Sequence, residues 1–220
     1  MYHEIKPIPD SATEIAERAF YDNTQLTSVS IPESVTIIGS AAFYYCENLS
    51  TVTMQRGLKE IRSSAFEDCT SLKKIVLPEG FETLDNYVFS NTGLQEITIP
   101  NSIISVGYGN SIKEMGRGVF AGCKGLISVT LPNSITSIEV SQFANCTSLE
   151  TITVPKSVKT IKECAFLACS SLKSITIPSS VNSIEMEAFE DCSGDLTIYG
   201  REDSYVHKYA KKNKLKFKAK

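Results

Sequence analysis

The sequence predicts a β-solenoid, an elongated stack of similar coils, and three regularities support this prediction. Phenylalanines recur at gaps of 23 residues, interrupted once by a gap of 31, at Phe20, Phe43, Phe66, Phe89, Phe120, Phe143, Phe166 and Phe189. One position of the same repeat is proline at Pro9, Pro32, Pro78, Pro100, Pro132, Pro155 and Pro178, with Gln55 at the one vacant place. Six of the 7 cysteines each follow one of these phenylalanines by three residues. A fixed period of this length is the signature of a repeat architecture.

The repeat unit follows the pattern LxxIxIPxxVxxIxxxAFxxCxx, and its leading leucine is numbered position 1. Regular units occupy residues 26–48, 49–71, 72–93, 126–148, 149–171 and 172–195. Residues 94–125 form one irregular unit, and residues 3–25 form a degenerate first coil. We therefore predict a single domain over residues 1–220, with seven repeats in 26–195 and a C-terminal cap in 196–220.

Each part of the unit has a structural interpretation. Aliphatic residues at positions 1, 4 and 6 alternate with polar residues at positions 3 and 5, which predicts a short half-buried strand. Proline at position 7 lacks an N–H group and ends the strand. Aliphatic residues at positions 10 and 13 turn inward on the return side, and the Ala-Phe pair at positions 17 and 18 closes the coil. One coil cannot bury its apolar edges alone, so neighbouring coils must stack.

These units resemble the BspA-like leucine-rich repeats, a 23-residue branch of the leucine-rich repeat superfamily. The resemblance covers residues 3 to 200 and implies a right-handed, β-rich leucine-rich repeat solenoid. Such a solenoid has a parallel sheet on one face and short strands or turns on the other. Residues 196–217 resemble the last strand and capping helix of such arrays. At helical spacing, Tyr205, Tyr209 and Ala210 are expected to face inward, with Lys208, Lys211 and Lys212 outside.

The irregular unit contains a stretch, residues 101–116, that repeats itself after nine residues. Ile103 and Val106 fit positions 10 and 13 when counted from Pro100, while Ile112 and Met115 fit them when counted back from Phe120. The unit therefore carries an insertion near residues 102–110, with Gly107 to Asn110 as its tip. Either a tolerated insertion or a specific binding role fits the sequence. The GxGxxG/A match at residues 116–121 is attributed to repeat positions, because no βαβ pattern surrounds it.

The cysteines at position 21 are interpreted as a ladder of free, buried thiols. They are Cys46, Cys69, Cys123, Cys146, Cys169 and Cys192, and Cys164 makes the count odd. The chain has only two histidines, His3 and His207, and no CxxC pair, so no metal site is predicted. No paired acid and base or nucleophile is evident. We predict no catalytic residue, no cofactor and no enzymatic activity.

Strand positions 3 and 5 form an outward strip of mostly hydroxyl side chains, with a charged interruption at Lys74 and Glu96. This strip is either exposed β-structure of ordinary composition or an extended binding face, because solenoids offer long concave surfaces. The candidate partner-binding residues are Lys74, Glu96, Thr98, Ser128, Thr130, Thr151, Thr153, Ser174 and Thr176 on the strip, with Tyr108 and Asn110 in the insertion.

The predicted function is a non-enzymatic protein- or glycan-binding module. The resemblance implies a cell-surface or secreted, adhesin-like protein, with host matrix proteins among its possible partners. The first thirty residues contain no signal peptide pattern, so an intracellular leucine-rich repeat scaffold is the alternative. No apolar run has the length of a membrane helix, so no membrane insertion is expected, and a monomer that binds no nucleic acid is predicted.

Charge is unevenly distributed along the chain. The last fourteen residues hold seven lysines and no acid, whereas the first 206 residues carry 15 basic and 25 acidic side chains. The basic end is interpreted as a solubilising segment, with contact to an anionic surface or to nucleic acid as the alternative.

Overall fold

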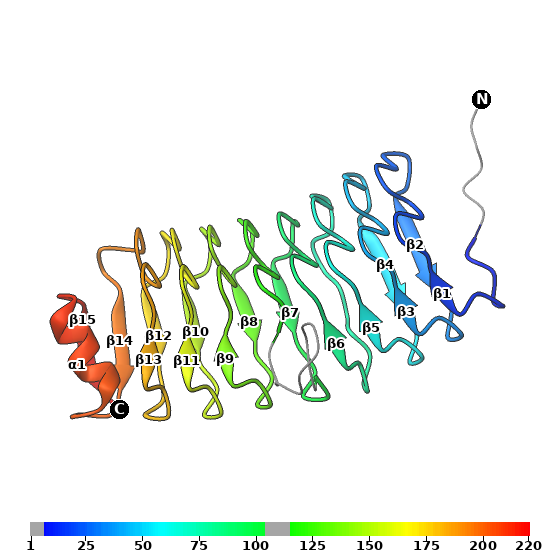
Figure 1. The fold of residues 1–220 in the computed structure, drawn as a ribbon. Coiled ribbons are helices and arrows are strands. Elements are labelled where there is room, and N and C mark those ends of the chain that lie inside the picture. The colour runs from blue at the N-terminus through cyan, green and yellow to red at the C-terminus, as the bar shows by residue number, and fades with distance from the viewer. Residues whose placement is uncertain (1–6, 104–114) are drawn as a thin grey trace.

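The chain forms an elongated single-file stack of coils, shown in Figure 1. The computed structural model describes residues 7–103 and 115–220. Successive coils lie side by side in chain order from one end of the stack to the other, and the C-terminal helix lies at the far end (Figure 1). This arrangement confirms the predicted solenoid.

The longer strands occupy the first part of each unit and form one face of the stack. They are β2 (Ser28–Ile31), β4 (Thr51–Met54), β7 (Glu96–Thr98), β8 (Ser128–Thr130), β10 (Thr151–Thr153), β12 (Ser174–Thr176), β14 (Thr197–Gly200) and β15 (Lys216–Ala219). Their pairing is parallel, and the β10–β12 register of Thr151 with Ser174 reproduces the repeat interval. The strands form three separate ladders, β2-β4, β7-β8 and β10-β12-β14-β15.

Two-residue strands line the opposite, return side. They are β1 (Glu14–Ile15), β3 (Ile37–Ile38), β5 (Glu60–Ile61), β6 (Thr83–Leu84), β9 (Ser137–Ile138), β11 (Thr160–Ile161) and β13 (Ser183–Ile184). They pair in parallel as β1-β3-β5-β6 and β9-β11-β13. The predicted contrast between a face of longer strands and a face of short strands is therefore confirmed.

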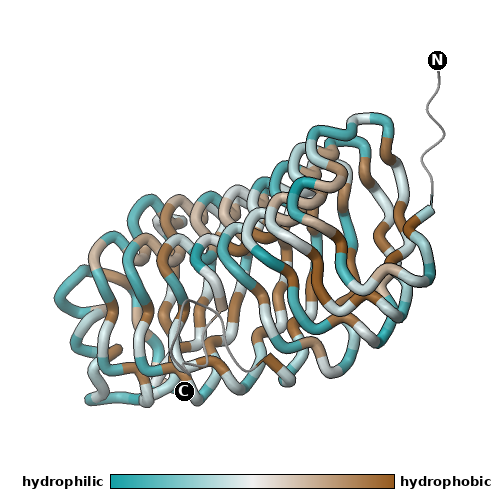
Figure 2. Tube along the Cα trace, turned by 45° about the vertical axis from the view of Figure 1, so that its right-hand side comes forward, coloured by the Kyte–Doolittle hydropathy of each residue, from teal (hydrophilic) through white to brown (hydrophobic). Residues whose placement is uncertain are grey.

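The core is a set of side-chain rows that run along the stack. All eight repeat phenylalanines stack in sequence order, with centroid separations between 5.0 Å for Phe20–Phe43 and 6.0 Å for Phe89–Phe120. Six of these rings, from Phe43 to Phe166, are fully buried. Figure 2 shows hydrophobic segments recurring at equivalent places from coil to coil, with hydrophilic segments at the turns.

The turn around each phenylalanine, which we call the Phe corner (positions 16 to 20), has a special backbone. In every coil the residues at positions 16 and 20 have positive φ, for example Ser64 at 58° and Asp68 at 61°. In the irregular coil these places are filled by Gly118 and Gly122, which adopt positive φ without steric cost. Gly118 of the glycine-rich match therefore serves a repeat turn.

The thiols of the position-21 cysteines connect neighbouring coils. Each Sγ donates to the backbone oxygen of the phenylalanine in the preceding coil, as in Cys46 to Phe20 at 3.0 Å and Cys146 to Phe120 at 3.1 Å. All seven cysteines are free, as predicted, although Cys164 and Cys192 are only partly buried. Burial raises the pKa of the Cys46 and Cys123 thiols to about 11.

The irregular coil keeps its core positions by combining the two halves of the duplicated stretch. Ile103 and Met115 are both buried, and the Gly116 amide donates to the Leu84 carbonyl at 3.0 Å. Ile103 therefore supplies position 10 and Met115 supplies position 13. The predicted insertion tip, including Tyr108 and Asn110, lies outside the described residues.

The stack ends in the predicted helix, α1 (Tyr205–Lys212), followed by strand β15, which was not predicted. Lys208, Lys211 and Lys212 are exposed, as expected, and Ala210 is buried. Tyr205 was expected to face inward but is 40% exposed, and Val206 takes the buried place. The Tyr205 hydroxyl stays at the surface, where it accepts a hydrogen bond from the Ile184 amide at 3.1 Å.

Candidate functional site

The predicted strip lies on the outer surface of the longer-strand face. Its side chains at positions 3 and 5 are exposed from Ser28 through Thr153, and Ser174 and Thr176 are partly exposed. The residues between them, such as Val52 and Ile152, are buried. The alternation inferred from the sequence therefore holds along the whole face.

The third coil interrupts this face, because its residues 72–77 form no strand. Lys73 accepts a backbone hydrogen bond from Gln95 at 3.1 Å. Within the described ranges 7–103 and 115–220, no backbone hydrogen bond joins residues 74–77 to β4 or β7. The longer-strand ladder is thus open on both sides of this segment.

Two sequence features set the third coil apart from its neighbours. Its unit is one residue short, and Phe81 occupies position 10, where other coils carry smaller residues such as Val35 or Val158. The Phe81 ring is fully buried. A larger side chain in a packed core displaces the backbone around it, which is consistent with the loss of strand pairing in this coil.

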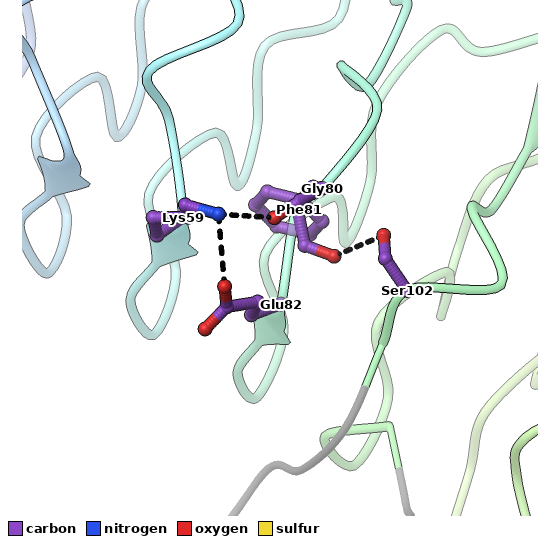
Figure 3. A network of polar contacts seen from close by, with 5 residues as sticks. All are labelled: Lys59, Gly80, Phe81, Glu82 and Ser102. Atoms are coloured by element: carbon purple, nitrogen blue, oxygen red, sulfur yellow. Dashed lines mark hydrogen bonds and ion pairs between the residues drawn. The ribbon is translucent and has the colours of Figure 1, made fainter.

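The turn of the third coil is nevertheless anchored from both neighbouring coils, as Figure 3 shows. From the second coil, Lys59 Nζ donates to the Gly80 carbonyl at 3.0 Å and pairs with Glu82 at 2.9 Å. From the fourth coil, Ser102 Oγ donates to the Phe81 carbonyl at 2.6 Å. The coil is therefore fixed at its turn while its strand segment lacks ladder partners.

A hollow of about 460 Å³ lies on this face over the third to fifth coils, and we call it the strip hollow. It is lined by Lys74, Ile75, Val76, Leu77, Glu79, Glu96, Ile97, Thr98, Pro100, Ser128 and Thr130. Lys74 Nζ and Glu96 Oε1 lie 3.4 Å apart across it, with side chains 69% and 64% exposed. An ion pair this exposed contributes little to stability, so both charges remain available to a partner.

The hollow brings together five of the predicted partner-binding residues. Lys74, Glu96, Thr98, Ser128 and Thr130 line it, whereas the predicted residues Thr151, Thr153, Ser174 and Thr176 continue along the strip beyond it. Sequence analysis did not select Val76, which is 68% exposed. The sequence did contain a signal for Val76, because the other units within residues 26–195 carry serine or threonine at position 5.

Metal clusters and membrane-spanning helices are both absent from the described residues. Within them, no group of three or more His, Cys, Asp or Glu side chains is arranged to hold a metal ion. No helix in the described ranges has the length and apolar character required to span a bilayer.

Comparison with known proteins identifies the repeat. The profile of the "BspA type Leucine rich repeat region (6 copies)" matches residues 4–109 and 103–216. The chain belongs to the BspA-type leucine-rich repeat family. Members of this family are non-enzymatic repeat proteins that generally bind other proteins. A search of the curated proteins gave no match.

Two solved structures with TM-scores above 0.5 support the same fold. A leucine-rich repeat protein of T. pallidum, TpLRR, is 27% identical over 94% of this chain and 78% of its own, with a TM-score of 0.57. A leucine-rich repeat protein from Eubacterium ventriosum is 21% identical over 87% of this chain and 58% of its own, with a TM-score of 0.56. The chain is also similar to a leucine rich cell surface protein from Faecalibacterium prausnitzii, with 24% identity, coverage of 93% and 80%, and a TM-score of 0.40.

Proposed function

We propose that this chain is a non-enzymatic binding module that engages a protein partner through the strip hollow, as part of a surface-displayed, adhesin-like protein. The observation that carries the proposal is the hollow itself. It lies where the strand ladder is open, and it combines an exposed aliphatic side chain, Val76, with an exposed pair of opposite charges. Apolar contact area with a few charged groups at its rim is typical of protein interfaces.

A partner is first identified by applying the purified chain to arrays of matrix proteins and of glycans. The charge-reversal variant Lys74→Glu with Glu96→Lys then tests the site. The matched control reverses Lys173 and Glu150, which lie 3.5 Å apart with similar exposure on another part of the molecule. Charged groups at an interface set partner specificity and association rate, so we expect the strip-hollow variant to weaken binding about tenfold. Equal weakening by the control, or no effect of either variant, contradicts the proposed site.

An intracellular scaffold is the second candidate function, and the seven free cysteines favour it. Free thiols are common in reducing compartments, whereas exported proteins more often pair them. The genomic reading frame distinguishes the two functions. A start codon at Met1 with no upstream export signal supports the scaffold, and an upstream export signal supports surface display.

A further inference from the structure

A second surface, separate from the strip hollow, carries a cluster of tyrosines on the Phe corners of the degenerate coil (residues 3–25) and of the first repeat (residues 26–48). The Tyr21 and Tyr44 rings stack with centroids 5.2 Å apart, and Tyr45 lies 5.2 Å from Tyr44 with its ring tilted by 40°. The Arg18 guanidinium lies over the Tyr21 ring, 4.7 Å from the centroid. Tyr21 is 43% exposed and Tyr45 is 42% exposed.

The fold does not require these tyrosines. They occupy positions 19 and 20, where the third coil has Ser90 and Asn91 and the fifth coil has Ala144 and Asn145. Tyr45 even occupies a left-handed backbone position, with φ of 60°, where a bulky residue is sterically disfavoured. Tyrosine and arginine are the residue types most enriched among the side chains that dominate protein interfaces, so the cluster fits a binding role.

Three carboxylates flank the rings and outnumber the one cation of the cluster, Arg18. Asp22 and Asp68 occupy position 20 in the coils on either side of Tyr45. Glu67 is the position-19 residue of the coil after that of Tyr44. Backbone hydrogen bonds from Asp22 to Tyr44 and from Tyr45 to Glu67 hold these coils in register. Within residues 7–103 and 115–220, none of the three carboxylates is in an ion pair.

The carboxylates also act on one another and on the nearest tyrosine. Partial burial, opposed by hydrogen bonds from Ser64 and Ser90 and reinforced by the nearby Asp68 charge, raises the pKa of Glu67. Desolvation and then the charges of Asp68 and Glu67 raise the pKa of the Tyr44 hydroxyl. A cation placed beside these groups relieves the repulsion between them.

We propose that this tyrosine corner, made of Tyr21, Tyr44, Tyr45, Asp22, Glu67 and Asp68, binds a basic segment of a protein partner. Lysine or arginine side chains of that segment lie over the tyrosine rings and pair with the flanking carboxylates. A cation over an aromatic face is stabilised by the ring quadrupole, and Arg18 already uses the Tyr21 ring in this way. Residues 18–24, 41–47 and 64–70, which fill positions 16 to 22 of these neighbouring coils, hold four acids and a single base, so the charge favours a basic partner.

The test uses the full chain and a hexa-arginine peptide as the probe, with calorimetric titration at low salt and again at high salt. The first variant combines Tyr44→Ser with Tyr45→Asn, which installs the residues that the third coil carries at these positions. Folding is preserved because asparagine suits the left-handed position. We expect binding to weaken about tenfold or more, and binding to the unaltered chain to weaken as salt rises.

Two matched controls separate this site from the general acidity of the protein. The pair Glu67→Ser with Asp68→Asn is compared with Glu190→Ser with Asp191→Asn, which makes the same changes at the same repeat positions of the last repeat, residues 172–195. Tyr87→Ser removes a tyrosine of equal exposure outside the cluster. The Glu67 and Asp68 substitutions are expected to weaken binding, whereas the Glu190 and Asp191 substitutions and Tyr87→Ser are expected to leave it unchanged. Unchanged binding by the double tyrosine variant, equal effects of the two acidic pairs, or equal binding of a hexaglutamate peptide overturns the proposal.

Discussion

The Phe corner and the longer-strand face are two surfaces of the same coils, yet they differ in continuity. At the corner, backbone hydrogen bonds such as Phe43 to Ala65 and Phe120 to Gln142 join every coil to the next, including the irregular one. On the strand face, the ladder opens at the third coil and again between β8 and β10. The longer-strand ladder is therefore interrupted, while the backbone hydrogen bonds at the corner run through the whole stack.

The two surfaces are therefore expected to serve different roles, the corner in stability and the strand face in binding. The corner combines buried rings, thiol hydrogen bonds and paired backbone, so substitutions of its core residues are expected to destabilise the protein. The strand face exposes short polar side chains, and the fold is kept although residues 74–77 pair with neither neighbouring strand. The outward residues of this face are therefore available for binding. The predictions that follow probe this contrast, beginning with the largest effect.

Removal of one ring from the phenylalanine stack has the largest expected effect. Phe120 is fully buried, and its centroid lies 6.0 Å from that of Phe89 and 5.6 Å from that of Phe143. Phe120→Ala is expected to lower the free energy of unfolding by about 3–5 kcal/mol, since it leaves a cavity in the core. Chemical denaturation measures the loss. The control Thr130→Ala, on the strand face, is expected to change it by about 0.5 kcal/mol or less.

Alkaline pH weakens the corner through its thiols. Burial raises the pKa of Cys46 and Cys123 from 9.0 to about 11. The unfolded chain therefore releases these protons first, and the stabilisation that is complete below pH 9.0 is lost as pH rises toward about 11. The expected loss is on the order of 2 kcal/mol for each thiol. Denaturation as a function of pH measures it.

The double variant Cys46→Ala with Cys123→Ala serves as the control for this loss. Other groups, such as tyrosines and lysines, titrate in the same range, so the relevant quantity is the difference between the two curves. The free energy of unfolding of the variant should fall less steeply with pH over this range than that of the unaltered protein. Identical slopes would show that these thiols titrate alike in the folded and unfolded chains.

Relief of backbone strain at the corner has the smallest expected effect on the free energy of unfolding. Unlike the changes above, it should raise this free energy. Ala168 occupies position 20 with φ of 56°, where asparagine stands in the third and fifth coils. Ala168→Asn is expected to stabilise the protein by about 0.5–1 kcal/mol, because asparagine tolerates left-handed backbone better than alanine. Ala121→Asn, at position 19, is the control. Thermal unfolding should show no stabilisation by this substitution.

The sequence carries most of the fold because equal spacing translates into equal packing. The periodic Phe, Pro and Cys residues predict the stack, its register and its buried rows, and the family resemblance of residues 196–217 predicts the capping helix. The outward placement of Lys74, Glu96 and the hydroxyl residues follows from alternation within a strand. The extent of the domain and the partner remain predictions.

Other features leave little trace in the sequence. Positions 16 and 20 hold residues as different as Ala41, Ser64 and Tyr87, so their left-handed backbone is imposed by the stack rather than by glycine. The missing strand of the third coil is not visible as a period, because a single larger residue such as Phe81 at position 10 leaves the spacing of the repeat unchanged. Tyr205 satisfied the helical spacing, but its hydroxyl group favours a surface hydrogen bond over burial.

Residue-resolved amide hydrogen exchange on the full chain tests the contrast between corner and strand face most directly. Exchange reports local opening free energies, so the corner amides of Phe43, Phe120 and Phe143 should exchange most slowly. The amides of residues 74–77 should exchange rapidly, although the side chains of Ile75 and Leu77 are buried. Protection of residues 74–77 equal to that of the corner amides would contradict the account.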